Sequence, residues 1–91
     1  MEIQRAKQSG GEHNERREKE ESQRRRRLQV MIGMVMSVIG QDPDLTLEEA
    51  AEMAASARRA ALSMFPGKEL AYDIIYRPRL QRMIDERFRL H

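Results

Sequence analysis

The fold of this chain is decided where four arginines run into an apolar segment, Arg24-Arg-Arg-Arg-Leu-Gln-Val-Met-Ile-Gly-Met-Val-Met-Ser-Val-Ile39. The twelve residues from Leu28 to Ile39 contain no charge. Residues 1–27 are polar and charged, with almost no apolar side chain after Ile3, whereas residues 28–91 contain everything that can build a core. We therefore expect two parts, a charged Arg/Glu-rich arm over residues 1–27 and a helical domain over residues 28–91.

The apolar segment repeats with the period of an α-helix. Leu28, Ile32 and Ile39 are spaced so that they fall on one helical face. Apolar residues also cover most of the remaining circumference, which predicts a helix buried between neighbours. Gly33 and Ser37 are four residues apart, and such small residues let two helix backbones approach closely. We expect the oligomer or partner interface to consist of Leu28, Met31, Ile32, Val35, Met36 and Ile39.

The arm itself divides into two stretches. Residues 4–14 lack periodicity and contain the pair Gly10-Gly11, so we expect disorder up to about residue 11. From Glu12 onward, several glutamates precede an arginine or lysine by four residues, which is the favourable order for ion pairs along a helix. The spacing predicts a solvated helix that begins near residue 12 and continues through the apolar segment.

Two further helices follow. Thr46 and Glu49 form the pattern of a capping box, which predicts a helix start, and Pro66-Gly67 predicts its end. The third helical segment begins near Lys68 and meets Pro78, where we expect a kink because a proline cannot continue the hydrogen-bond ladder. The expected fold class is all-α, a small hairpin or bundle of three helices with the third kinked at Pro78, and with a charged, partly disordered N-terminal arm.

Chain length favours self-association. With 91 residues, of which about sixty remain for packing once the arm is set aside, the core is close to the size where a single domain is marginal. The charge is uneven: residues 1–27 carry nine Lys/Arg against six Asp/Glu, and residues 28–66 carry two against five. A basic arm and an acidic middle segment can attract each other. The small size of the core is the reason to expect self-association, as a dimer or a higher oligomer.

Several chemistries find no support in the sequence. The chain has no cysteine, and its two histidines, His13 and His91, have no second ligand at metal-binding spacing. No nucleophile–base set, phosphate loop or dinucleotide motif is present. The apolar segment is shorter than the roughly 20 residues of a transmembrane helix, and the charged arm before it does not fit a signal peptide. We expect no enzyme activity, no cofactor, no metal and a cytoplasmic location.

The arginines admit three interpretations. They contact the phosphates of DNA or RNA, or they contact an acidic protein partner, or they form a solvated helix surface paired with glutamates. A membrane surface is a weaker fourth alternative, because the adjoining apolar segment lacks a polar face and aromatic anchors. Interleaved glutamates oppose the first interpretation, since they repel the same phosphates. The candidate residues for nucleic acid or an acidic partner are Arg16, Arg17, Arg24, Arg25, Arg26 and Arg27.

A second candidate patch lies near the expected kink. Tyr72 and Tyr76 are four residues apart and close in sequence to Arg77 and Arg79, so arginine side chains can stack on the aromatic rings. The alternative is a pair of tyrosines at the edge of the core with solvated hydroxyls.

The sequence therefore predicts a small non-enzymatic interaction or regulatory protein. It self-associates or binds another helical protein through apolar helices, and its Arg-rich arm contacts an acidic surface. The alternative is an accessory protein that binds nucleic acid non-specifically through the arm.

Overall fold

The computed structural model describes residues 2–89, with side chains from Asn14 onward, and all of its regular structure in that range is helical. Four helices follow one another: α1 (Glu2–Gln41), α2 (Leu47–Met64), α3 (Glu69–Ile75) and α4 (Arg77–Phe88). The predicted all-α class is confirmed. The disorder expected up to about residue 11, with a helix only from about residue 12, is not confirmed, because α1 already begins at Glu2.

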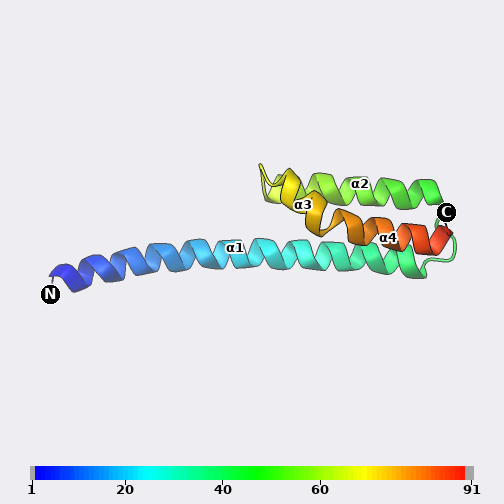
Figure 1. Cartoon of the computed structure of the whole chain (residues 1–91). Helices are drawn as coiled ribbons and strands as arrows, with labels where there is room; N and C mark the ends of the chain where they lie inside the picture. Colours follow the sequence, from blue (N-terminus) through cyan, green and yellow to red (C-terminus); the bar gives the residue numbers. More distant parts are fainter. Residues whose placement is uncertain (1, 90–91) are drawn as a thin grey trace.

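Three helical layers lie side by side in the bundle. Helix α2 runs back along the C-terminal half of α1, and α4 then returns beside both of them (Figure 1). The bundle begins near Arg24, whose side chain reaches the end of α2. Before that point, α1 continues past the bundle without a neighbouring helix (Figure 1). One helix therefore serves both as a wall of the core and as a projecting arm.

The start of α2 follows the predicted capping box. The Thr46 Oγ1 accepts a hydrogen bond from the Glu49 amide at 3.1 Å, and the Glu49 Oε1 accepts one from the Thr46 amide at 3.2 Å. These bonds satisfy two donors that a helix start otherwise leaves unpaired. Leu45, immediately before the cap, is buried and fixes the entry of the chain. Three alanines, Ala50, Ala57 and Ala61, line the buried side of α2 and allow close packing.

The third predicted helix is divided into two. Helix α3 ends where the Tyr76 amide donates to the Tyr72 carbonyl, and α4 begins at the next residue. Pro78 lies in the first turn of α4, where a backbone N–H has no helical partner and its absence costs nothing. In a helix that continued from α3, residue 78 would have to donate an N–H to the Ile74 carbonyl, and a proline has none. The break is therefore caused by Pro78, as predicted, and is located at Tyr76.

The core occupies the space between α1, α2 and the α3–α4 segment. No charged residue of the described part is buried in it. Helices α1 and α4 approach closely at Gly40, since a Cβ added there would lie 3.1 Å from the Met83 Cε. The buried residues are Leu28, Ile32, Ile39, Leu45, Ala50, Ala57, Ala61, Tyr72, Leu80 and Ile84.

Helix α1 is packed on one side only, which differs from the expectation of a helix buried between neighbours. Val30, Met34 and Val38 are 57%, 65% and 36% exposed. The physical reason is that α2 and α4 both lie against the side that carries Leu28 and Ile39, and no helix within residues 2–89 covers the other side.

Candidate partner-binding groove

An apolar groove lies at the end of the bundle where α2 passes into α3. It has a cavity volume of about 290 Å³, and among the described side chains the charged ones that line it are Arg25 and Lys68. The apolar part of the lining comes from three helices, which makes the groove a product of the fold rather than of one segment. The lining residues are Arg25, Leu28, Ala61, Leu62, Phe65, Lys68, Ala71, Tyr72, Ile75 and Tyr76.

Exposed apolar side chains of α3 extend this groove outward. Leu70 is 74% exposed, Ile74 is 65% exposed and Ile75 is 47% exposed. Leu70 and Ile74 are four residues apart and lie on one face of the helix. Single exposed apolar residues are ordinary in soluble proteins, but a contiguous set beside an apolar groove is typical of an interaction surface.

Cations border the apolar groove on the side of the arm. A second cavity of about 560 Å³, lined in part by Arg24, Arg25 and Lys68, adjoins the groove and shares Phe65 with it. The Arg24 guanidinium carbon lies 6.0 Å from the centre of the Phe65 ring, at cation–π distance. Of the side chains from Asn14 to Arg89, Glu21 is the one acidic residue that lines this second cavity. The groove therefore has an apolar floor and a predominantly positive rim.

The fold separates the four consecutive arginines. Successive residues of an α-helix are rotated by about 100°, so a run of four points in four directions. Arg24 and Arg25 line the cavities beside the groove, whereas Arg26 and Arg27 line neither cavity and are exposed. Arg27 instead lies on the row of α1 that continues to Val30. The arginine cluster is therefore two sites, one facing the groove and one facing away.

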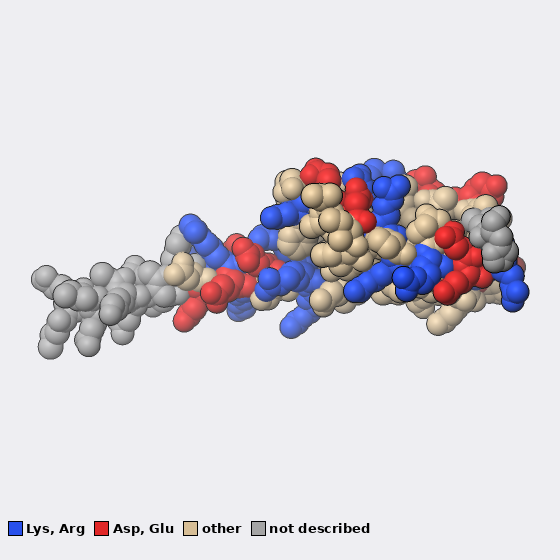
Figure 2. Space-filling view, viewed as in Figure 1, with Lys and Arg blue, Asp and Glu red and all other residues tan. Residues whose placement is uncertain are grey.

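The remaining predicted arginines lie further along the arm. Arg16 and Arg17 precede Arg24 by about two helical turns and do not line the groove. The exposed surface around them alternates between basic and acidic residues (Figure 2). The glutamates on this stretch are Glu15, Glu18, Glu20 and Glu21.

The predicted oligomer interface is mostly inside the chain. Leu28, Ile32 and Ile39 are buried in the core, and Ile39 is 0% exposed. Their side chains are therefore used for packing within one copy, which corrects the expectation that they face a partner. Met31, Val35 and Met36 are partly buried at the edge of that core. The exposed side chains of this segment are ones that the prediction did not include.

The predicted tyrosine–arginine patch is divided as well. Tyr72 is buried, with its ring centre 5.6 Å from that of Tyr76, and its hydroxyl has no hydrogen-bond partner among the described residues. Burial raises the pKa of the Tyr72 hydroxyl. The Arg79 guanidinium carbon lies 5.9 Å from the centre of the Tyr76 ring, as the stacking interpretation expects. Arg77 is exposed and lines a different cavity of about 350 Å³.

One ion pair that sequence reasoning missed fixes α3 against α2. The Arg58 Nε and Nη2 donate to the two carboxylate oxygens of Asp73 at 2.9 and 3.2 Å. This hydrogen-bonded guanidinium holds the pKa of Asp73 below its usual value. The two residues are 15 positions apart and separated by a turn, so no helical periodicity could have linked them. The pair orients the helix that carries Leu70 and Ile74.

Comparison with known proteins adds no family assignment. No family model matches the chain, and neither curated proteins nor solved structures yielded a match. Among the described residues, no group of three or more His, Cys, Asp or Glu is arranged to hold a metal ion. Within the same residues, every helix falls short of the combined length and apolarity that crossing a bilayer requires. The groove at the α2–α3 end, with its arginine rim, is the site on which a functional assignment depends.

Proposed function

We propose that this chain is a helical interaction protein that binds an acidic, amphipathic segment of a protein partner at the α2–α3 groove. The observation that supports the proposal is the combination of an apolar groove of about 290 Å³ with Arg24, Arg25 and Lys68 along its edge. Apolar side chains of the partner enter the groove and contact α3, while its carboxylates face the cations. This is the helix-in-groove mode of recognition, in which apolar anchors supply affinity and rim charges supply specificity.

The preference for an acidic protein segment over nucleic acid comes from the surroundings of the arginines. A phosphate backbone needs a continuous positive surface, and the exposed glutamates of the arm interrupt one. A phosphate backbone would also leave the apolar side chains of Leu70 and Ile74 exposed to water, whereas a partner helix would cover them. Binding of nucleic acid through the arm is the alternative outcome of the test below.

The test uses a defined probe. A labelled synthetic helix with leucines on one face and glutamates on the other is titrated with the full chain at low and moderate salt. A peptide with lysines in place of the glutamates is titrated in parallel, as are labelled duplex and single-stranded DNA and RNA. We expect binding of the glutamate peptide and at least a tenfold weaker binding of the lysine peptide, because the rim charge discriminates between them.

Matched variants locate the site. R25E combined with K68E reverses two rim charges and is expected to abolish peptide binding, whereas R82E, which changes an exposed arginine of α4 that lines no part of the groove, leaves binding unchanged. Equal affinity for the two peptides would refute the proposal. Tight, salt-sensitive DNA or RNA binding that Arg24–Arg27→Ala abolishes would replace it with the nucleic-acid function.

A further inference from the structure

A second apolar surface lies on α1, on the side away from α2 and α4. It is formed by Val30, Met34 and Val38, three exposed side chains four residues apart that we call the α1 stripe. Residues at this spacing stand one above another on a helix. The stripe follows directly on Arg27 and has no part in the groove at the α2–α3 end. It is therefore an apolar surface that the proposed partner does not cover.

The residues beside the stripe are small. Gly33 and Ser37 form the adjacent row of α1, and both are exposed. A Cβ added at Gly33 would meet nothing within 4 Å, so no segment of the described chain uses the space that the missing side chain leaves. Small residues in such a row permit a second helix to approach the backbone closely.

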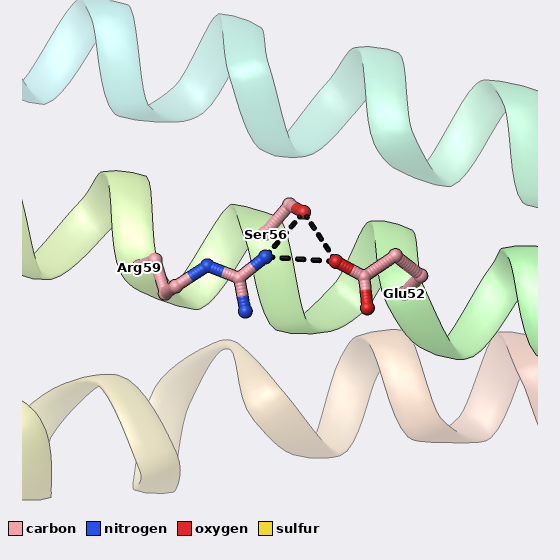
Figure 3. Close-up of polar contacts among 3 residues, drawn as sticks. All are labelled: Glu52, Ser56 and Arg59. Atoms are coloured by element: carbon pink, nitrogen blue, oxygen red, sulfur yellow. Dashed lines mark hydrogen bonds and ion pairs between the residues drawn. The ribbon is translucent and has the colours of Figure 1, made fainter.

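A shallow groove between α1 and α2 lies beside the stripe. Met31 and Val35 of α1, with Met53, Ala57 and Ala60 of α2, line this groove, which has a cavity volume of about 340 Å³. Glu52 and Ser56 also line it. There the Arg59 Nη2 lies 2.8 Å from both the Glu52 Oε1 and the Ser56 Oγ, and the three side chains hold one another in place along α2 (Figure 3). The surface thus has an apolar floor and an ordered polar edge.

Opposite charges lie at the two ends of the stripe. Arg26 and Arg27, which are exposed and line neither cavity at the α2–α3 end, precede it on α1, and the exposed acidic residues Asp44, in the loop after α1, and Glu48, at the start of α2, follow it. A second copy in antiparallel orientation places the basic end of one stripe beside the acidic end of the other. A parallel copy would instead bring arginines against arginines, which is unfavourable at short range. The charge order therefore selects an antiparallel partner of the same sequence.

We propose that the α1 stripe is the interface of a homodimer, in which two α1 helices pack antiparallel about a two-fold axis near Met34. In this register, Val30 of one copy is level with Val38 of the other, and Arg27 is level with Gln41, the last residue of α1. The interface is self-complementary, as a two-fold dimer requires. It also adds a second apolar contact to a core of marginal size.

Cysteine crosslinking tests the register directly, because the natural chain has no cysteine. V30C and V38C are prepared separately and then mixed, and a short bifunctional maleimide is added to each sample. We expect efficient crosslinks only in the mixture, since positions 30 and 38 are about 12 Å apart along the helix and do not meet their own copies. Crosslinking of V30C alone would indicate a parallel pair, and an absence of crosslinks in all samples would exclude the interface.

Particle mass provides an independent readout. The natural chain is expected to have the mass of a dimer by light scattering, and M34E that of a monomer, because the two-fold axis sets the two new carboxylates side by side. Met34 is 65% exposed, so M34E should keep its helical circular dichroism. L70E, a matched change at an exposed residue of α3, should remain dimeric. A monomeric natural chain, or a dimeric M34E, would overturn the proposal without affecting the peptide-binding test.

Discussion

At the residue scale, Arg87 connects the last helix to the end of the first. Its Nη1 donates to the Ile39 carbonyl at 2.8 Å, and its Nη2 donates to the Asp42 carbonyl. The Ile39 carbonyl belongs to the last turn of α1 and therefore lacks a following helical turn to bond it, whereas the Asp42 carbonyl lies just past the helix end and also accepts from the Leu45 amide at 3.4 Å. A charged donor at this position also interacts favourably with the negative end of the helix dipole. Arg87 is thus a C-terminal cap supplied from elsewhere in the chain.

We expect Arg87→Met to lower the free energy of unfolding by about 1–3 kcal/mol, because two carbonyls lose a charged donor while most of the side-chain volume is kept. Urea unfolding followed by circular dichroism measures the difference. Arg82→Met, at an exposed arginine of the same helix, should change stability by less than about 0.5 kcal/mol. An equal effect of the two substitutions would contradict the capping role.

The Arg58–Asp73 pair predicts a pH dependence. Because the Arg58 hydrogen bond lowers the pKa of Asp73 in the folded chain, the pair stabilises the fold above the ordinary aspartate pKa of about 3.9. That contribution is lost as the pH falls through the lower, folded value. We expect Asp73→Asn to be less stable than the natural chain near neutral pH and to show a smaller loss of stability on acidification.

Urea midpoints for the natural chain and Asp73→Asn, taken at intervals from neutral to acidic pH, check this expectation. Glu86→Gln is the control. It also removes a carboxylate, but from an exposed site of α4 that has no bidentate arginine partner among the described contacts. If the difference between the natural chain and Asp73→Asn stays constant over the whole range, the pair does not contribute in the manner described.

At the scale of elements, local signals in the sequence predicted helix ends better than helix faces. The capping box at Thr46, the end of α2 before Pro66-Gly67 and the break caused by Pro78 were all predictable, because each depends on residues within a few positions. Which side of α1 is exposed could not be predicted from the sequence. Its apolar residues cover most of the circumference, so periodicity alone cannot say which side meets α2 and α4.

The candidate site was predictable only in part for the same reason. The arginines and apolar residues were identified, but the groove is assembled from residues as far apart as Leu28 and Tyr76. Leu70 and Ile74 lie in the third helical segment, and no local pattern in the sequence marks them as uncovered. Arg58–Asp73 and Arg87–Ile39 are likewise tertiary contacts without a local signature.

The glycine on the α1 stripe side gives a prediction at this scale. Gly33 lies inside a helix, and a Cβ there has open space, so Gly33→Ala should stabilise the isolated chain by about 0.5–1 kcal/mol through the lower entropy of its unfolded state. The measurement is urea unfolding of M34E with and without Gly33→Ala. Both proteins are expected to be monomers, so that a change in association does not contribute to the difference. A loss of stability from Gly33→Ala would mean that another group of the folded chain occupies the space beside Gly33.

At the scale of the whole molecule, two apolar surfaces share one long helix and face different directions. The groove at the α2–α3 end uses Arg24 and Arg25, and the α1 stripe begins beyond Arg27. Under the two proposals, an antiparallel dimer would carry its two grooves at opposite ends. A partner with two acidic segments could then be bound with higher avidity than a partner with one, provided that its linker spans the distance.

The cap that Arg87 supplies also bears on the order of events when the chain folds. Its hydrogen bond to Ile39 joins residues 48 positions apart, so it can form only once the end of α4 lies against the end of α1. Contacts between such distant residues close a long loop and are typically made late in folding. Arg87→Met should therefore accelerate unfolding far more than it slows refolding. The lifetime of the folded bundle, more than the speed of its formation, depends on one arginine near its C-terminal end.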